Sequence, residues 1–209
     1  MEVLSKLLTS TWAALATALL AIVIFVLNPS PIETLQLKTF DYLIDSLESK
    51  NSDEIILVEF GEKSVQKYGQ WPFKRDQYAN LIAQLYAHNA GLVVWNIMMP
   101  ENDRLGGDKA LADTLKDYPV ILANTPSQTP KNQAKKPGSA IIGSEHIDTI
   151  LNYPGVIANI PALETNAVGV GITNTLPEVD GVNRRMPLLV TVDGKLYLHP
   201  LQCCSIDQP

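Results

Sequence analysis

A charge-free run of apolar residues near the N-terminus most constrains what this chain can fold into. No charged residue lies between Lys6 and Glu33, and residues 7–27 read LLTSTWAALATALLAIVIFVL. A helix needs about 20 mostly apolar residues to cross the hydrocarbon core of a bilayer. The run is therefore long enough to span a membrane, and residues 28–31 (NPSP) end the helix because proline lacks an amide donor.

Two alternatives remain for residues 7–27. A cleaved signal peptide has a shorter apolar region of about 7–15 residues and a small-x-small cleavage site, whereas this run ends in Val26-Leu27-Asn28-Pro29. A core helix is disfavoured because the uncharged run lies at the very terminus. We favour an uncleaved, single-pass signal anchor. Lys6 precedes the span, although Glu2 offsets part of its charge, so the positive-inside rule favours an N-in orientation with the main domain extracytoplasmic.

The remaining residues have the composition of an acidic globular domain. Residues 1–32 hold one Glu and one Lys, so the whole formal net charge of −6 belongs to residues 33–209. Hydrophobic residues make up 46% and charged residues 18% of the chain, which excludes intrinsic disorder. An acidic balance argues against a nucleic-acid partner, and two cysteines exclude a disulfide-dense scaffold. We predict an anchor over 1–32, one domain over 33–200 and a tail over 201–209.

Alternating helical and strand patterns predict an α/β fold class for the main domain. The predicted helices cover residues 35–47, 76–90 and 108–117. The predicted strands cover residues 54–60, 92–99, 120–123 and 168–173. This order is typical of a mixed, mostly parallel sheet flanked by helices.

Turn residues refine this outline. Asp193-Gly194 is a strong hairpin signal and joins residues 186–192 to residues 195–198, so we expect a C-terminal β-hairpin. Residues 125–138 hold three Pro and three Lys, which indicates a mobile loop. Residues 148–152 fit a helical turn. Asp76 suits a helix start, and Gly91 suits a position just past the helix end.

Signatures of catalysis, metal binding and cofactor binding are weak. His88, His146 and His199 are scattered without ligand spacing, and Cys203-Cys204 is interpreted as an accidental pair in the tail, with an interchain bridge as the alternative. Residues 106–109 (GGDK) lack the spacing of a phosphate-binding loop. Residues 169–171 (GVG) more simply allow close strand packing. We therefore predict no catalytic residue, no metal and no cofactor.

Two sequence blocks resemble those of a sensor family. Residues 69–75 (GQWPFKR) and residues 180–187 (DGVNRRMP) resemble blocks of CHASE domains of the second type, which are extracytoplasmic sensor domains associated with bacterial cyclases and histidine kinases. The similarity extends over most of residues 35–200. Phe60-Gly61 stands where the family usually has Ile-Asp, and Asn96 stands where it usually has Asp. Relatives continue into an output module, so the resemblance suggests a chain truncated before its kinase or cyclase.

The resemblance also suggests ligand-binding residues. Trp71 and Phe73 are expected to line a pocket at the carboxyl ends of the strands, unless Trp71 closes the edge of the core. Arg75 and Arg184 offer guanidinium forks for an anion, with structural ion pairs as the alternative: Asp76 or Asp180 for Arg75, and a solvated charge pair for Arg184. Asp108 is expected to cap its helix. The predicted ligand-binding residues are Trp71, Phe73, Arg75, Asn96 and Arg184.

Three functions are compatible with these patterns. The leading hypothesis is a membrane-anchored extracytoplasmic sensory domain for bacterial signal transduction, which binds an unknown small ligand, forms a homodimer through its anchor and first helix, and lacks its own output enzyme. The first alternative is an envelope-anchored hydrolase of unknown substrate, and the second is a structural dimerisation module. The absence of a catalytic motif favours a non-enzyme.

Overall fold

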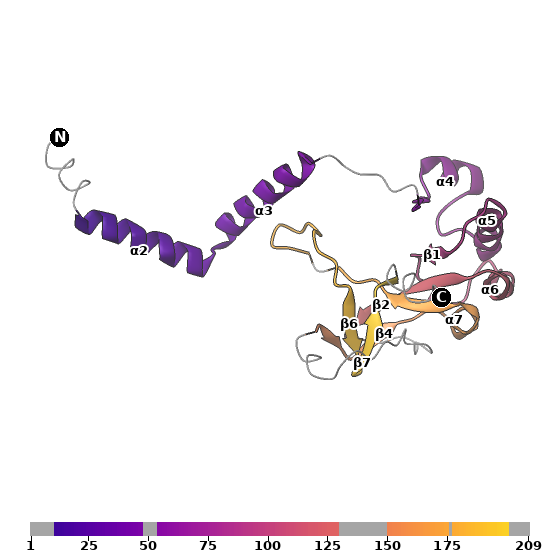
Figure 1. The fold of residues 1–209 in the computed structure, drawn as a ribbon. Coiled ribbons are helices and arrows are strands. Elements are labelled where there is room, and N and C mark those ends of the chain that lie inside the picture. The colour runs from indigo at the N-terminus through magenta and orange to yellow at the C-terminus, as the bar shows by residue number, and fades with distance from the viewer. Residues whose placement is uncertain (1–10, 48–53, 130–149, 176, 201–209) are drawn as a thin grey trace. The chain divides into compact units, whose positions relative to one another are not determined.

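The computed structural model describes residues 11–47, 54–129, 150–175 and 177–200, which divide between two compact units (Figure 1). The first comprises Met1–Leu57 with Pro177–Arg184 and is called the helical unit here. The second comprises Val58–Leu176 with Arg185–Pro209 and is called the α/β unit. Cys203, Cys204 and His146, which the sequence analysis considered, lie outside the described residues.

Two helices separated by a sharp bend dominate the helical unit. Helix α2 spans Thr11–Leu27 and helix α3 spans Ser30–Asp45, with an angle of 77° between them. Pro29 is the N-cap of α3 and Pro31 lies in its first turn, where a missing amide donor costs no helical hydrogen bond. The predicted helix end at residues 28–31 is thus confirmed, and α3 contains most of the helix predicted over residues 35–47.

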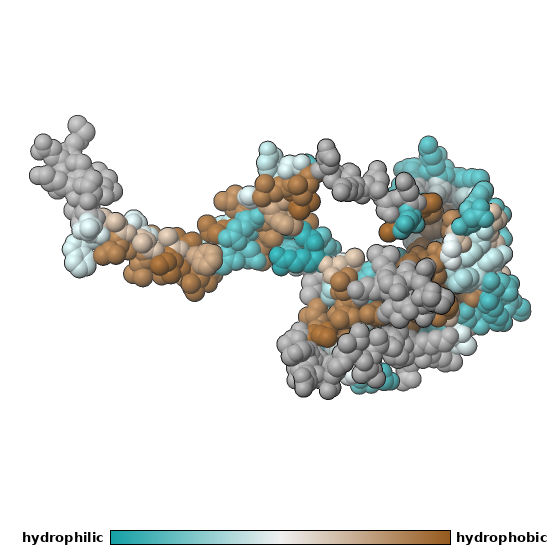
Figure 2. All heavy atoms as spheres, viewed as in Figure 1, coloured by the Kyte–Doolittle hydropathy of each residue, from teal (hydrophilic) through white to brown (hydrophobic). Residues whose placement is uncertain are grey.

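The apolar character of the N-terminal helices fits more than one role. Neither α2 nor α3 alone has the length and composition of a membrane span, whereas the bent pair together does. A signal sequence near the N-terminus has the same properties. Figure 2 shows the apolar surface of α2, most of whose side chains are exposed. Phe25 is 78% accessible and Leu20 is 59% accessible.

A four-stranded mixed sheet forms the centre of the α/β unit. Strand β2 (Val120–Ser127) lies between β1 (Val93–Trp95) and β5 (Gly169–Ile172), and both neighbours run parallel to it. Strand β4 (Gly155–Ile157) pairs antiparallel with the carboxyl-terminal part of β2. The predicted α/β class is confirmed. Strand β2 is longer than expected, because residues 125–127, assigned to a loop by composition, pair with β4.

A smaller second sheet contains the predicted hairpin. Strands β6 (Leu189–Val192) and β7 (Lys195–Leu198) pair antiparallel, and β3 (Asn152–Tyr153) runs parallel to β6. Asp193 and Gly194 both have positive φ values, 49° and 70°, as a two-residue type I′ turn requires. The helical turn predicted over residues 148–152 is wrong at Asn152, which lies in β3, and residues 148–149 are not described.

The described helices of the α/β unit are α4 (Glu62–Tyr68), α5 (Arg75–Ala87), α6 (Asp108–Asp117) and α7 (Pro161–Asn166). The main core joins side chains of α5, α6 and α7 to the central sheet: Ile82, Leu111, Leu163, Val120 and Leu122. A second core holds residues of both sheets: Val156, Ile172, Val190, Val192 and Tyr197. The helices predicted at 76–90 and 108–117 are confirmed, although the left-handed residue after α5 is Asn89 (φ 67°) rather than Gly91.

The strand predicted over residues 54–60 is not formed. The described residues 54–61 contain no strand. The next strand in the chain, β1, forms its described ladder with β2. Ile55, Ile56 and Leu57 are 73–90% exposed. The boundary between the two units falls after Leu57, so this segment connects units instead of packing on a sheet. The strand predicted over 92–99 shortens to β1.

Two glycines in one strand give a matched test of the packing in the α/β unit. A Cβ on Gly171 would lie 2.5 Å from the Cα of Pro200, whereas a Cβ on Gly169 would meet the Cγ1 of Ile121 at an ordinary 3.7 Å. The expectation that these glycines allow close packing is therefore confirmed at Gly171. The backbone of Pro200 cannot move aside as the flexible side chain of Ile121 can. Alanine should therefore be tolerated less well at Gly171 than at Gly169.

We expect Gly171→Ala to lower the free energy of unfolding by about 1–3 kcal/mol, as overpacking does. Gly169→Ala is expected to be neutral or to stabilise by up to about 1 kcal/mol, since glycine inside a strand costs conformational entropy. The measurement is the urea midpoint of the full chain in detergent, monitored by tryptophan fluorescence; Trp71 and Trp95 lie in the α/β unit, and Trp12 in α2 contributes to the same signal. Equal midpoints for both variants would contradict the tight contact at Pro200.

Candidate functional site

Hydrogen-bonding side chains gather where the parallel strands of the α/β unit end. Asn96 follows β1 and Thr173 follows β5, and the Thr173 hydroxyl donates to Asn96 Oδ1 at 3.1 Å. The Thr173 amide donates to the carbonyl of Asn124 in β2 at 2.8 Å. Asn174 Nδ2 donates to the Tyr153 hydroxyl at 2.8 Å. We call Asn96, Thr173 and Asn174 the polar edge. Its amide and hydroxyl groups are the kind that orient small polar ligands.

A fully buried polar network lies next to this edge. Asn124, Asn159 and Glu164 are each at most 1% exposed. Asn124 Nδ2 donates to Glu164 Oε1 at 2.7 Å, and Asn159 Nδ2 donates to Asn124 Oδ1 at 2.7 Å. Asn159 Oδ1 accepts the amide of Met99 at 2.7 Å. A satisfied network of this kind rigidifies its surroundings, so it holds β2, α7 and the segment after β1 in fixed positions.

Sequence reasoning missed this network. Asn124 and Asn159 carry no motif, and their only local signal is a polar residue directly after an apolar stretch in each case. Glu164 lies in the short helix α7 at 0% exposure, which no periodic pattern indicated. Side chains 35 and 40 positions apart in the chain meet here. Contacts of that range depend on the fold and cannot be inferred from spacing.

Trp71 and Phe73 lie in a cluster of aromatic rings. Their ring centroids are 5.5 Å apart, Trp71 is 5.6 Å from Phe60, and Tyr78 packs on Trp95 at 5.2 Å. Phe73 is 5% exposed and belongs to the main core, whereas Trp71 is 43% exposed at the edge of the cluster. Burial raises the pKa of the Tyr78 hydroxyl, which accepts the Phe73 amide at 3.1 Å. Within this pair, only Trp71 offers a large accessible surface to a ligand.

Arg75 is buried in a network of its own. Its guanidinium donates to Asp108 Oδ1 and to the carbonyl of Glu101, and its amide donates to Asp103 Oδ2 at 2.9 Å. The alternative that Arg75 pairs with Asp76 or Asp180 is wrong, because Asp76 pairs with Lys74 at 2.5 Å and Asp180 pairs with Arg184 at 2.7 Å. The Arg75 side chain is 8% exposed and Asp108 is 27% exposed. An anion would therefore have to displace Asp108 to reach this guanidinium.

Asp108 does not have the role that the sequence predicted for it. Gly107 is the N-cap of α6 and makes no side-chain cap bond, whereas Asp108 is the first residue of the helix. The Asp108 carboxylate accepts the Asp103 amide and pairs with Arg75. The reason is position: an N-cap side chain must precede the first helical residue. Asp108 joins the loop after β1 to α5 and α6.

Arg184 forms an ion-pair cluster in the described part of the helical unit. Its Nε and Nη2 donate to the two oxygens of Asp41 at 2.6 and 2.7 Å. Its Nη1 and Nη2 donate to the two oxygens of Asp180 at 2.9 and 2.7 Å. The Arg184 side chain is 7% exposed. We call these three side chains the Arg184 clasp. The alternative of a charge pair is confirmed for Arg184, which pairs with two carboxylates, and the Asp41 side chain of this pair is 48% exposed.

The charges of the clasp shift its pKa values in a consistent direction. Hydrogen bonds from Arg184 lower the pKa of Asp180 to about 2 and also lower the pKa of Asp41. The same two carboxylates raise the pKa of Arg184. Stability from a lowered carboxyl pKa is present above the unfolded value and is lost as the pH falls through the folded value. The clasp is therefore fully charged at neutral pH and loses its Asp180 contribution only between about pH 4 and pH 2.

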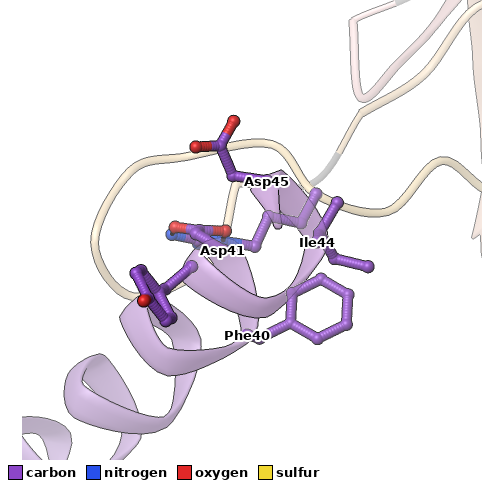
Figure 3. Close-up of a pocket in the computed structure, with 6 residues that line it drawn as sticks. Phe40, Asp41, Ile44 and Asp45 are labelled. Atoms are coloured by element: carbon purple, nitrogen blue, oxygen red, sulfur yellow. Dashed lines mark hydrogen bonds and ion pairs between the residues drawn. The ribbon is translucent and has the colours of Figure 1, made fainter. Parts of the chain in front are cut away.

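An open pocket lies beside the clasp on α3. It is lined by Phe40, Asp41, Tyr42, Ile44, Asp45 and Arg184. Asp41 and Asp45 lie on successive turns of the helix (Figure 3). Asp41 is engaged by Arg184, so the accessible walls of the pocket are mainly aromatic and aliphatic. This pocket belongs entirely to the helical unit.

The five predicted site residues thus fall into separate surroundings. Trp71 and Phe73 share the aromatic cluster, Arg75 pairs with Asp108, and Asn96 bonds to Thr173. Arg184 lies in the helical unit and the other four lie in the α/β unit. Within the described ranges, no group of three His, Cys, Asp or Glu side chains is placed to hold a metal ion. Of the five, Trp71 and Asn96 are exposed enough for direct contact with a ligand.

Arg75→Gln tests whether Arg75 is a structural residue. Removing one partner of a mostly buried pair leaves Asp108 and the Glu101 carbonyl unsatisfied, so we expect a loss of about 2–3 kcal/mol in the free energy of unfolding. Arg104→Gln removes the same charge from an exposed position in the loop after β1 and is expected to change it by less than about 0.5 kcal/mol. Chemical denaturation measures both. An unchanged stability for Arg75→Gln would contradict a structural role for Arg75.

Comparison with known families gives one match. The model of the CHASE2 domain matches residues 16–206, which is nearly the whole chain. The match includes α3, the aromatic cluster, the polar edge and the Arg184 clasp. No curated protein and no solved structure matches the chain.

Proposed function

The chain belongs to the CHASE2 family, whose domains are sensory and usually extracytoplasmic in signalling proteins, and we propose that it is a membrane-anchored receptor domain for a small polar ligand. The family match over residues 16–206 is the observation that carries this function. CHASE2 domains are themselves non-catalytic. The proposal adds three specific elements to that membership: a place for the ligand, an N-terminal anchor and a homodimer.

The ligand site is proposed at the polar edge of the α/β unit. In open α/β sheets, ligands bind outside the carboxyl ends of the strands, and Asn96 and Thr173 occupy that position here. Asn96 replaces the usual family Asp with an uncharged amide, which donates as well as accepts hydrogen bonds. A neutral or zwitterionic ligand suits such a group better than a cation. Trp71 is the exposed aromatic surface proposed to contact the ligand.

The other predicted residues have supporting roles in this proposal. Phe73 is part of the core beneath Trp71 and fixes its position. Arg75 holds the loop after β1 through Asp103, Asp108 and the Glu101 carbonyl. That loop follows Asn96 in the chain, so Arg75 acts on the ligand edge through the backbone. Arg184 acts on α3.

The anchor and the homodimer rest on the N-terminal helices. The charge-free run of residues 7–27 and the exposed apolar surface of α2 support a membrane-embedded segment with the N-terminus inside. Helix α3 follows directly and exposes Phe40 and Leu43 to at least 51% each. A second copy on the same membrane would bring two such helices side by side, which supports a dimer through the anchor and α3.

Ligand binding can be tested on the full chain in detergent. Fractions of a polar metabolite extract are screened for a rise in the midpoint of thermal unfolding, because a ligand of the native state stabilises it. Asn96→Ala is expected to weaken binding of the active fraction at least about tenfold, as loss of a hydrogen bond to a ligand does. Asn80→Ala is the matched control, since Asn80 is an exposed asparagine of α5. Undiminished binding by Asn96→Ala would reject the site. A screen in which no fraction raises the unfolding midpoint would reject the proposed ligand-binding function.

The membrane topology can be tested with fusions after Pro209. Alkaline phosphatase needs disulfides and is active only outside the cytoplasm. In a Gram-negative host we therefore expect the phosphatase fusion to be active and the fusion to green fluorescent protein to be non-fluorescent. Alkaline extraction of the membranes should leave the chain in the pellet if the anchor is uncleaved. Deletion of residues 7–27 is the control and should abolish phosphatase activity. A bright fluorescent fusion would contradict an extracytoplasmic domain.

A further inference from the structure

Four consecutive apolar residues are exposed where the chain passes from the helical unit into the α/β unit. Residues 55–58 read IILV, and we call them the apolar connector. Ile56 is 83% exposed, Leu57 is 90% exposed and Val58 is 48% exposed. The boundary between the units falls after Leu57. Exposed apolar side chains that are adjacent in this way mark sites at which another molecule binds.

The backbone of the apolar connector is as accessible as its side chains. Residues 55–60 belong to neither a helix nor a strand. Within the described part of the chain, no hydrogen bond involves the main chain of residues 55–59. Free amide and carbonyl groups allow a binding protein to take up a segment as an added strand. An endopeptidase binds its substrate in this way, and the connector supplies both the main-chain groups and the apolar side chains.

Leu105 is an exposed apolar residue whose surroundings differ from those of the connector. It lies in the loop after β1 and is 63% exposed. Its amide donates to Asp103 Oδ1 at 2.9 Å, and the Gly106 amide donates to the Asp103 carbonyl at 3.1 Å. Cleavage of a native protein requires local opening. This loop must therefore lose hydrogen bonds before it enters a protease cleft, whereas the apolar connector loses none.

A cut in the apolar connector removes the covalent link from α3 to the α/β unit. The C-terminal fragment keeps residues 177–184, and Arg184 of that segment bonds to Asp41 of α3. The Asp41 side chain is 48% exposed. Partly exposed ion pairs contribute little binding free energy, so they are too weak to hold two separate chains together at micromolar concentration. A cut here therefore separates the α/β unit from the N-terminal helices.

We propose that residues 55–58 are a processing site at which an endopeptidase specific for apolar side chains releases the α/β unit. Water adds across one peptide bond of this segment. The hydroxyl group joins the carbonyl carbon, and the leaving amine takes the proton, so no other reactant is consumed. The inference goes beyond the proposed function because it requires neither a ligand nor a dimer. Only its cellular part rests on the proposed extracytoplasmic location, where the protease would meet the connector.

Limited digestion of the full chain in detergent with thermolysin, which cuts on the amino side of apolar residues, tests the site. Mass spectrometry identifies the new N-termini, and we expect cleavage at residues 55–58 to be about tenfold or more faster than at Leu105. The double variant Ile56→Asp, Leu57→Asp removes exposed apolar side chains and should slow this cleavage at least about fivefold. Leu105→Asp is the matched control and should change it less than about twofold. Cleavage at the connector no faster than at Leu105 would overturn the proposal.

The same variants test processing in cells. The full chain with an epitope tag after Pro209 is produced in a Gram-negative host, and its membrane and soluble envelope fractions are compared. We expect a soluble tagged fragment that begins within residues 56–58, with at least about fivefold less of it from the double variant and an unchanged amount from Leu105→Asp. No such fragment, or an equal amount from the double variant, would overturn the proposal. The phosphatase fusion reports the location separately, so failed processing and a wrong topology are distinguishable.

Discussion

The buried hydrogen bonds among Asn124, Asn159 and Glu164 are the constraint on which the α/β unit depends. Glu164 Oε1 accepts both the Asn124 amide group and the Asn159 backbone amide, at 2.7 and 3.2 Å. The three side chains connect β2 to α7 and, through the Met99 amide, to the segment after β1. An unpaired polar group in such a place costs far more than a satisfied one gains. The network therefore allows one relative placement of these elements, and the polar edge is built on it.

The sequence predicted those elements whose signal is local. The Asp193-Gly194 turn specifies a hairpin by its own backbone preferences, and the periodic apolar residues of α5 and α6 specify their buried faces. The strand predicted over residues 54–60 was wrong because a strand also needs a neighbouring strand to pair with. Ile55 and Ile56 have the propensity of a strand but no described ladder, and only Phe60 of that segment packs against the main core.

The candidate site was predictable only in part, for a related reason. The family resemblance pointed to Trp71, Arg75, Asn96 and Arg184 as residues with a specific role, but not to their partners. Asp108 pairs with Arg75 across 33 positions and Asp41 with Arg184 across 143. A charged residue in a motif has the same appearance in sequence whether it awaits a ligand or is already paired. The structure distinguishes these cases, and in it both guanidinium groups are paired with carboxylates.

The helical unit is discontinuous in the chain, and this limits how the sensor can be treated as a module. A cut at the apparent border after residue 57 would keep Arg184 and Asp180 but discard Asp41. The guanidinium would then lose one of its two carboxylates. A fusion of this domain to another anchor must therefore include α3. Any recombination that joins this sensor to a different N-terminal segment must either preserve α3 or supply an acidic residue at the equivalent turn.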